Sequence, residues 1–259
     1  MYFFYLVSLL KLKNIIMQEI VYHTNYKLEE HYWWFVARNN IIYSLIDHYS
    51  NIKAGSKILD VGCGTGAFAQ ILSEKYEVLC LDTSPIALDY CRKRGLKDLF
   101  ESTIQQFPAR EHNIDAITML DVIEHVDDDR DLVRTGYDIL PPGGYLISTV
   151  PAYQWLWSKH DITHMHYRRY TKGKFNDLIT QSGFEIVFSS YFNSILFPFG
   201  AAERIFKKIT PGVKNEAPVN PVSETTNTLL KKIFLAEKNL LKYFSFPFGL
   251  SIFTLNVKK

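Results

Sequence analysis

Three closely spaced glycines, Gly62, Gly64 and Gly66, are the residues whose spacing best suits the binding of a nucleotide-like ligand. They follow a short apolar run, and an amphipathic helical pattern begins directly after them at Ala67. Glycines carry no side chain, so the backbone amides at the start of such a helix can approach a ligand closely. We expect a nucleotide-like cofactor at this loop. A tight strand-to-helix turn is the simplest other explanation.

Two aspartates flank the loop at the ends of neighbouring predicted strands. Asp82 follows Gly62 by 20 residues, where a carboxylate can accept hydrogen bonds from both hydroxyls of a ribose. Residues 62–67 also fit the dinucleotide pattern GxGxxA, so an NAD-dependent oxidoreductase is a second interpretation. Asp60 argues against NAD, because a carboxylate there would repel a pyrophosphate and suits the cationic amino group of a methionine moiety.

His125 is the leading candidate for a catalytic base. It lies just past the predicted strand 114–119, at the carboxyl edge where sheets of this kind place their substrates. If the reacting group is a hydroxyl, a base must remove its proton, and histidine can do so near neutral pH. A structural histidine that packs the following helix is an equally good explanation.

A second cluster of polar and aromatic residues follows the predicted strand 145–150. His160 and His166 are further catalytic candidates there. His160 and His164, which are four residues apart, could instead hold a divalent metal with Asp161 or His166 if the segment is helical. The sequence shows no pattern that would orient such ligands, so we assign no metal site.

Tyr167, Arg168 and Arg169 belong to the same cluster. Arginines bind carboxylates and phosphates through paired N–H groups, so Arg168 and Arg169 could clamp an anionic substrate. A lid whose arginines pair with surface carboxylates is the alternative for each residue by itself. We expect the group as a whole to recognise the substrate.

Aromatic residues also gather near both ends of the chain. Residues 31–35 read His-Tyr-Trp-Trp-Phe and precede Arg38, which could meet the carboxylate of a bound cofactor. Residues 197–200 and 246–249 both read Phe-Pro-Phe-Gly. A hydrophobic substrate, a membrane surface or a dimer contact would each explain these motifs, although core packing or a dimer contact is simpler.

The elements that must position these residues alternate in a regular way from residue 57 onward. Short β-branched runs alternate with amphipathic stretches, which is typical of a parallel sheet with crossover helices. The expected strands are 57–61, 77–82, 99–102, 114–119, 145–150, 184–191 and 252–257. The expected helices are 67–75, 85–94, 129–140, 172–182 and 229–244, with loops at 152–170 and 211–228.

Length and composition fit one α/β domain with additions. The 259-residue chain is 47% hydrophobic and 22% charged, which excludes a disordered or fibrous protein. We divide it into a segment 1–16, an N-terminal helical cap at 17–54 and a main domain at 55–259, with an insertion at about 193–248. The apolar segment 1–16 is too short to span a membrane, so we interpret it as a wrongly assigned start or an interfacial helix.

Charge and cysteine content narrow the range of partners. The formal net charge is only +2, without a block of basic residues, so nucleic acid is not an expected partner. The three cysteines are an odd number without CxxC spacing, which favours a reducing cytoplasm. We expect a cytoplasmic monomer or homodimer without a transmembrane segment, and peripheral membrane contact stays open.

Four motifs taken together resemble those of class I S-adenosylmethionine (SAM) dependent methyltransferases. They lie in the family's order at residues 58–66, 81–85, 117–126 and 140–149. The resemblance covers roughly residues 31–190 and points to small-molecule enzymes such as the ubiquinone-biosynthesis O-methyltransferases. It implies a doubly wound, Rossmann-like α/β sheet of seven strands in the order 3-2-1-4-5-7-6, with strand 7 antiparallel, and SAM as the cofactor.

The resemblance also implies roles for individual residues. Asp82 matches the ribose ligand, and Leu120 matches a backbone contact to the methionine amino group. The other positions matched to the cofactor are Asp60, Gly62, Cys63, Gly64, Gly66, Thr83, Ser84, Thr103 and Ile104. Many relatives carry an acidic residue at the adenine-contacting positions 103 and 104, which this chain lacks.

The expected function is the transfer of a methyl group from SAM to a small-molecule or a lipid- or glycan-linked acceptor, at oxygen. An NAD-dependent oxidoreductase is the alternative enzyme. A SAM-binding protein that has lost turnover is the alternative outside enzymes.

Overall fold

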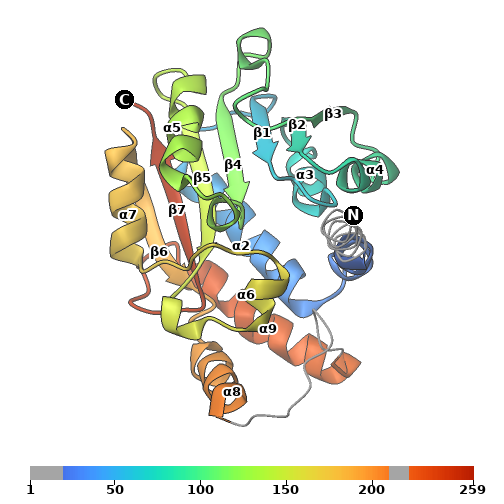
Figure 1. Ribbon diagram of the computed structural model, residues 1–259, viewed down its shortest axis with the longest axis vertical. Helices are drawn as coiled ribbons and strands as arrows, with labels where there is room; N and C mark the ends of the chain where they lie inside the picture. Colours follow the sequence, from blue (N-terminus) through green and yellow to red (C-terminus); the bar gives the residue numbers. More distant parts are fainter. Residues whose placement is uncertain (1–19, 210–221) are drawn as a thin grey trace, which may run out of the picture.

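Seven strands form a single sheet in the order β3-β2-β1-β4-β5-β7-β6 (Figure 1). The computed structural model of the chain describes residues 20–209 and 222–259, apart from the side chains of residues 207–209. The strands are β1 Lys57–Val61, β2 Glu77–Asp82, β3 Asp98–Glu101, β4 Ala116–Leu120, β5 Tyr145–Pro151, β6 Glu185–Phe192 and β7 Ser251–Val257. β7 runs antiparallel to both of its neighbours, and the other paired strands are parallel. The expected fold is confirmed.

The central strands are buried on both faces, as parallel strands between helical layers usually are. Every residue from Ile58 to Val61 is buried, and so is every residue from Val78 to Asp82. The carboxyl ends of β1, β2, β4 and β5 lie at one edge of the sheet, because these strands run parallel to one another. The loops that start there can carry a site.

Helices cover both faces of the sheet. They are α2 Trp33–Tyr49, α3 Ala67–Leu72, α4 Pro85–Lys93, α5 Asp129–Ile139, α6 Lys159–Thr163, α7 Lys172–Gln181, α8 Phe197–Ile209 and α9 Glu224–Leu240. Short 3-10 turns lie at η1 Ala109–Glu111, η2 Ile123–His125 and η3 Gln154–Leu156. Another helical segment, residues 20–28, precedes α2.

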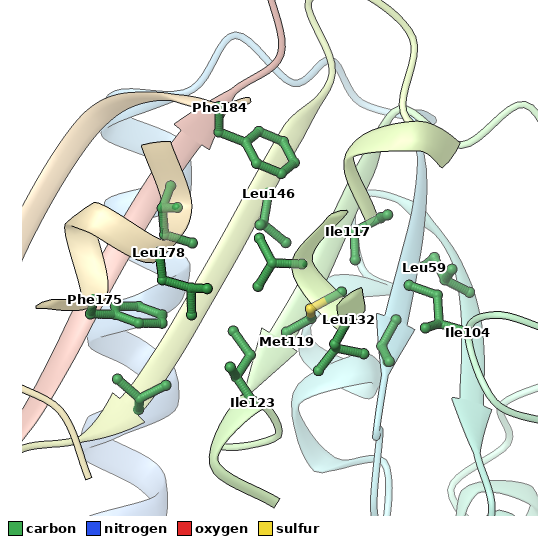
Figure 2. Packing of buried hydrophobic residues seen from close by; sticks show 14 of the residues in the cluster. Leu59, Ile104, Ile117, Met119, Ile123, Leu132, Leu146, Phe175, Leu178 and Phe184 are labelled. Carbon is green, nitrogen blue, oxygen red and sulfur yellow. The ribbon is translucent and has the colours of Figure 1, made fainter. Parts of the chain in front are cut away.

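Two hydrophobic clusters fill the space between the sheet and its helical layers. Figure 2 shows one of them, in which Leu132 of α5 and Phe175 and Leu178 of α7 lie over the strands. The other cluster joins α2, α3 and α9 to the opposite face. Leu59 belongs to the first cluster and Ile58 to the second, because successive residues of a strand point to opposite faces.

Helix α9 packs along α2 on one face of the sheet (Figure 1). The Asn227 side chain accepts a hydrogen bond from Trp33 N at 2.8 Å and donates one to His31 O at 2.9 Å. Near the other end of α2, Tyr49 Oη donates to Leu241 O at 3.0 Å. Helices α2 and α9 therefore form one helical layer on this face of the sheet.

The insertion helix differs from the prediction. α9 runs from Glu224 to Leu240, whereas we expected a helix from Leu229 to Phe244. The earlier start has a local cause, since the Ser223 hydroxyl accepts a hydrogen bond from Thr226 N at 3.2 Å and caps the helix. The other expected helices and strands differ from the structure by at most three residues at either end.

The segment 152–170, expected as a loop, contains η3 and α6. Ser158 and Asp161 form a capping box that starts α6. The expected segment 1–16 and the part of the expected link from 211 to 221 lie outside the described residues. Within the described residues, no helix combines the length and the apolar character needed to cross a lipid bilayer.

Candidate active site

The glycine-rich loop joins the end of β1 to the start of α3, as the sequence predicted. Gly62, Gly64 and Gly66 have φ angles of 66°, 56° and 81°, a backbone conformation that residues with a side chain rarely adopt. Gly62 N donates a hydrogen bond to Leu81 O at 2.7 Å and ties the loop to β2. The turn itself therefore requires these glycines.

Gly64 differs from the other two glycines in what surrounds it. A Cβ atom at Gly62 would lie 2.6 Å from the Val122 side chain, and one at Gly66 would lie 2.7 Å from the Leu96 side chain. A Cβ atom at Gly64 would meet nothing within 4 Å. Packing thus excludes a side chain at Gly62 and Gly66, whereas the space beside Gly64 is open to a ligand.

Asp82 ends β2 beside this loop, and only 8% of the residue is exposed. Its Oδ2 accepts a hydrogen bond from Gly64 N at 2.9 Å, and its Oδ1 accepts one from Ser84 N at 2.9 Å. Burial raises the pKa of the Asp82 carboxyl group, although these two bonds oppose the shift. Each carboxylate oxygen keeps a further lone pair, so Asp82 can accept hydrogen bonds from a ribose while it holds the loop.

Asp60 is buried in β1, directly before the loop. Thr118 Oγ1 donates a hydrogen bond to Asp60 Oδ1 at 2.5 Å. Burial raises the pKa of Asp60 to about 7, and the positive charge of Arg38 nearby opposes the shift only in part. A cationic amino group bound beside Asp60 would favour its charged form, which fits the interpretation drawn from the sequence.

Four other residues matched to the cofactor lie in the loops that follow β2 and β3. Ser84 is the N-terminal cap of α4, and both Thr83 and Thr103 are exposed. Ile104 is buried in the core, so only its backbone remains for a ligand contact. The Asp82 carbonyl accepts a backbone hydrogen bond at 3.1 Å from the second loop and keeps the two loops together.

Cys63 and Leu120 complete the matched set. Cys63 Sγ lies 3.8 Å from the Sγ of Cys91 in α4, so its side chain packs against that helix. Leu120 ends β4 and is half-buried against the α2 side of the sheet. Both residues lie at the carboxyl ends of the central strands, where the sequence placed them.

The N-terminal residues contribute a contact to the glycine-rich loop that the sequence did not reveal. The Thr65 hydroxyl donates a hydrogen bond to Glu29, which directly follows the helical segment 20–28. The almost fully buried Arg94 side chain forms an ion pair with Glu29 at 3.3 Å and donates a hydrogen bond to Thr65 O at 2.8 Å. These contacts hold the N-terminal segment against the loop.

Tyr22 is a second residue of this segment that the sequence did not mark. Burial and the negative charge of Asp82 together raise the pKa of Tyr22 to about 12, against a hydrogen bond with the Ser84 side chain that lowers it. The Tyr22 hydroxyl therefore lies close to the carboxylate that we assign to the ribose. Nothing in the spacing of the segment distinguishes Tyr22 from the tyrosines around it.

Arg38 of α2 reaches the carboxyl end of β4. Its Nη2 forms an ion pair with Asp121 Oδ2 at 2.6 Å and donates to Thr149 Oγ1 at 3.2 Å. The Nε of Arg38 is buried and has no hydrogen-bond partner among the described residues. An unpartnered N–H group at this edge suits the carboxylate of a bound amino acid, as the sequence analysis expected.

His125 ends η2, just past β4, at the same edge of the sheet. Its ring lies perpendicular to the ring of His166, with 4.5 Å between the centroids. Desolvation and the neighbouring His166 lower the pKa of His125 to about 4, although part of the residue is exposed. The ring is therefore neutral at physiological pH and keeps a free lone pair, although so low a pKa makes it a weak proton acceptor.

His160 has ring contacts with the other two histidines of its own segment. Its ring stacks near His164, with 4.0 Å between centroids, and lies 6.2 Å from the ring of His166. Burial lowers the pKa of His160 to about 3. The structure brings His125 and His166 together and leaves His160 beside His164, so the catalytic roles of His160 and His166 stay predictions.

The two neighbouring arginines do not form a joint clamp. Arg168 Nη1 pairs with Asp129 Oδ2 at 2.8 Å, whereas Arg169 Nε pairs with the buried Asp161 Oδ1 at 2.6 Å. Each guanidinium is thus bound to a different carboxylate of the chain, which favours the lid explanation over recognition of an anion by both arginines. Tyr167, which lies between His166 and these arginines in the chain, is exposed, and the centre of its ring lies 5.7 Å from the Arg168 guanidinium carbon.

Comparison with known proteins gives one family. A family profile described as "Methyltransferase domain" matches residues 35–191, more than half of the chain. A relative from Mycolicibacterium smegmatis named "Probable S-adenosylmethionine-dependent methyltransferase" is 25% identical over 162 residues, which are 61% of this chain and 61% of the relative. The ubiquinone biosynthesis O-methyltransferase of Alkalilimnicola ehrlichii is 34% identical over 100 residues, which are 36% of this chain and 40% of the relative.

These matches span less than two thirds of either relative's length. The solved structure of a SAM-dependent methyltransferase from Archaeoglobus fulgidus aligns with a TM-score of 0.57, covers 92% of this chain and 99% of that one, and is 16% identical. At such identity the likeness concerns the fold alone. The family match includes the glycine-rich loop, Asp82 and the histidine cluster. The chain therefore belongs to the methyltransferase-domain family of class I SAM-dependent methyltransferases.

Proposed function

We propose that this protein transfers the methyl group of SAM to the oxygen of a small-molecule or lipid-linked acceptor. One observation carries the proposal. The open space at Gly64, the Asp82 carboxylate and the His125–His166 pair lie along the same carboxyl edge of the sheet. A cofactor cradle and a cluster of proton-accepting groups on adjacent strand ends are what a methyl transfer to a hydroxyl requires.

Bound SAM supplies an activated methyl group and a good leaving group, so the protein's main task is alignment. The backbone at Gly64 and the carboxylate of Asp82 would hold the nucleoside. Arg38 Nε would bind the carboxylate of the methionine part, and Asp60 would balance its amino group. The donors and acceptors of these four residues fit the charges of the cofactor.

The acceptor side is formed by His125 and by the segment 152–170, called the lid below, which contains His166. The neutral imidazole of His125 can take the proton of an acceptor hydroxyl, so that the oxygen lone pair forms the new bond to carbon. We expect His125→Ala to reduce turnover by about 100-fold to 10,000-fold while SAM affinity stays nearly the same. Near-normal turnover would assign His125 to packing.

An apolar acceptor fits the surface around this edge. Trp155 and Tyr167, which lie in the same segment 152–170 as His166, are exposed. Exposed aromatic side chains near a site favour a prenylated, acylated or aromatic acceptor over a small hydrophilic one. Methylation at oxygen agrees with the relatives named ubiquinone biosynthesis O-methyltransferases.

Calorimetry with SAM, S-adenosylhomocysteine and NAD tests the cofactor. We expect the first two to bind and NAD not to bind, and tight binding of NAD alone would overturn the proposal. Incubation with methyl-labelled SAM and a panel of phenolic, prenylated and glycan-linked acceptors then tests the reaction. If the protein binds SAM and labels an amine but no oxygen acceptor, the assignment to oxygen is contradicted.

A further inference from the structure

We propose that Glu124, His125 and His166 form a binding site for a divalent transition-metal cation on the acceptor side of the active site. One potential ligand atom from each of these three residues lies within 4.8 Å of the other two. From the sequence we weighed His160 and His164 as metal ligands and assigned no metal site; we did not consider Glu124, which is 42 positions from His166 in the chain. The fold brings them together.

Glu124 is the residue of the cluster that most strongly indicates a cation site. Only 1% of the residue is exposed, and neither of its side-chain oxygens has a hydrogen-bond partner in another described residue. Burying a charged carboxylate without a partner costs roughly several kcal/mol, so a buried carboxylate usually binds a proton or a cation. One ring nitrogen of His125 and one of His166 lie within 4.8 Å of a Glu124 carboxylate oxygen and could share a cation with it.

His166 is oriented as a metal ligand would be. Its Nδ1 lies 2.9 Å from Oδ1 of Asp161, a fully buried carboxylate. Asp161 is held in place in turn, since it accepts hydrogen bonds from Ser158 N at 2.8 Å and Arg169 Nε at 2.6 Å. A histidine whose one nitrogen is bound to a carboxylate presents the other nitrogen in a fixed direction, which is the usual arrangement behind a metal-bound histidine.

The backbone fixes the cluster from both sides. Tyr167 N donates a hydrogen bond to Glu124 O at 2.8 Å, which joins the lid to η2 next to His166. His125 N donates to Val122 O at 3.0 Å within η2, and the backbone of His164 hydrogen-bonds to the His125 side chain. The three side chains therefore converge because two segments are pinned together.

Two imidazoles and one carboxylate suit Zn²⁺, Fe²⁺, Co²⁺ or Mn²⁺ better than Mg²⁺, which prefers oxygen ligands. Three protein ligands leave coordination positions open for a substrate. This inference rests on the proposed function for its role. With a metal bound, His125 would act as a ligand and not as the base. The metal would make the acceptor hydroxyl more acidic, so that its proton passes to water while the oxygen forms the bond to the methyl carbon and the carbon–sulfur bond breaks with its electrons on sulfur.

Binding of Mn²⁺ to the metal-stripped full-length protein, followed by electron paramagnetic resonance, tests the site. Mn²⁺ is the better probe than Zn²⁺, because Cys63, Cys80 and Cys91 also lie within 4.8 Å of one another and thiolates prefer softer metals. We expect one Mn²⁺ per chain. Glu124→Gln and His166→Ala should each weaken binding by about 100-fold or more.

His164→Ala is the matched control, because His164 lies in the same lid but outside the three-residue cluster. It should bind Mn²⁺ as the unaltered protein does. Loss of binding in His164→Ala with retention in His166→Ala would overturn the inference in favour of a site at the His160 and His164 pair. The inference would also be overturned if the unaltered protein did not bind Mn²⁺, or if His166→Ala bound Mn²⁺ as tightly as the unaltered protein does.

Two further measurements separate folding and function from metal binding. Mn²⁺ should raise the melting temperature of the unaltered protein but not of His166→Ala, so a variant that folds poorly is recognised by its melting curve without metal. SAM binding is measured in a separate titration. If the protein binds SAM but not Mn²⁺, this inference is contradicted and the proposed function is left intact. If it binds Mn²⁺ but not SAM, the reverse holds.

Discussion

Replacing Asp82 with asparagine should weaken cofactor binding strongly and change the stability of the free protein little. In the structure the Asp82 carboxylate accepts hydrogen bonds from Gly64 N and Ser84 N, both at 2.9 Å. Asparagine keeps one acceptor oxygen and presents an amide group where the other oxygen was. The ribose hydroxyls would therefore lose one acceptor, and their remaining partner would no longer be charged.

The size of the effect follows from these contacts. A hydrogen bond to a charged group contributes about 1.5–3 kcal/mol. Losing one such bond and weakening another costs about 3 kcal/mol, which is roughly a 100-fold loss of affinity. Burial raises the pKa of Asp82, so removal of the charge also relieves an unfavourable burial. This relief offsets the lost backbone bond, and we expect unfolding of the free protein to change by only about 1 kcal/mol.

Calorimetric titration with S-adenosylhomocysteine measures the affinity, and thermal unfolding without ligand measures the stability. Glu101→Gln is the matched control, because Glu101 is exposed on β3 in register with Asp82 and should leave both quantities unchanged. Affinity of Asp82→Asn within about threefold of the unaltered protein would refute the assignment of this carboxylate to the ribose.

Three other substitutions test separate parts of the site. Gly64→Ala and Gly143→Ala both place a side chain at positive φ with no atom within 4 Å, so each should lower the unfolding free energy by about 1–3 kcal/mol. Only Gly64→Ala should reduce SAM affinity in calorimetry. Equal SAM affinities of the two variants would show that the open space is not the cofactor site. Arg94→Met should weaken the buried contact with the N-terminal segment by about 3 kcal/mol and speed amide hydrogen exchange in residues 20–28. Unchanged exchange would show that Arg94 does not hold this segment against the glycine-rich loop. Burial raises the folded-state pKa of Asp60 to about 7, so the stability that its protonated form contributes at low pH is lost as pH rises from about 4 to 7. In denaturant titrations Asp60→Asn should therefore be roughly a few kcal/mol more stable than the unaltered protein at pH 8 and equally stable at pH 4. Parallel pH profiles for the two proteins would show that Asp60 does not cause this pH dependence.

The sheet and the cofactor edge could be predicted because their signals are local. The alternation that defines strands such as β1 and β2, and the glycines at the turn between β1 and α3, lie within a few residues of one another. Asp82 could be placed beside Gly64 because parallel neighbouring strands end at the same edge. Helix boundaries were less certain where a single cap decides them, as Ser223 does for α9.

Side-chain pairing across long separations could not be predicted in the same way. Glu29 and Arg94 are 65 residues apart, and each by itself fits an exposed surface position. Arg168 and Arg169 fit an anion clamp by sequence alone. Which carboxylates reach them depends on how the segment 152–170 folds on itself and packs against α5. The unpartnered state of Glu124 depends on the whole of its buried surroundings, which no local pattern encodes.

The position of β7 also governs when this sheet can be completed. Among the described strands β6 pairs with β7 alone, and β7, residues 251–257, follows both β5 and β6 in the chain. During synthesis β5 and β6 therefore emerge from the ribosome with open edges, and the strand that joins them is made after both. Contacts such as that between Ser148 and Thr254, 106 residues apart, form slowly. A truncation that removes β7 should leave an exposed strand edge and a chain that aggregates before it can reach the native state.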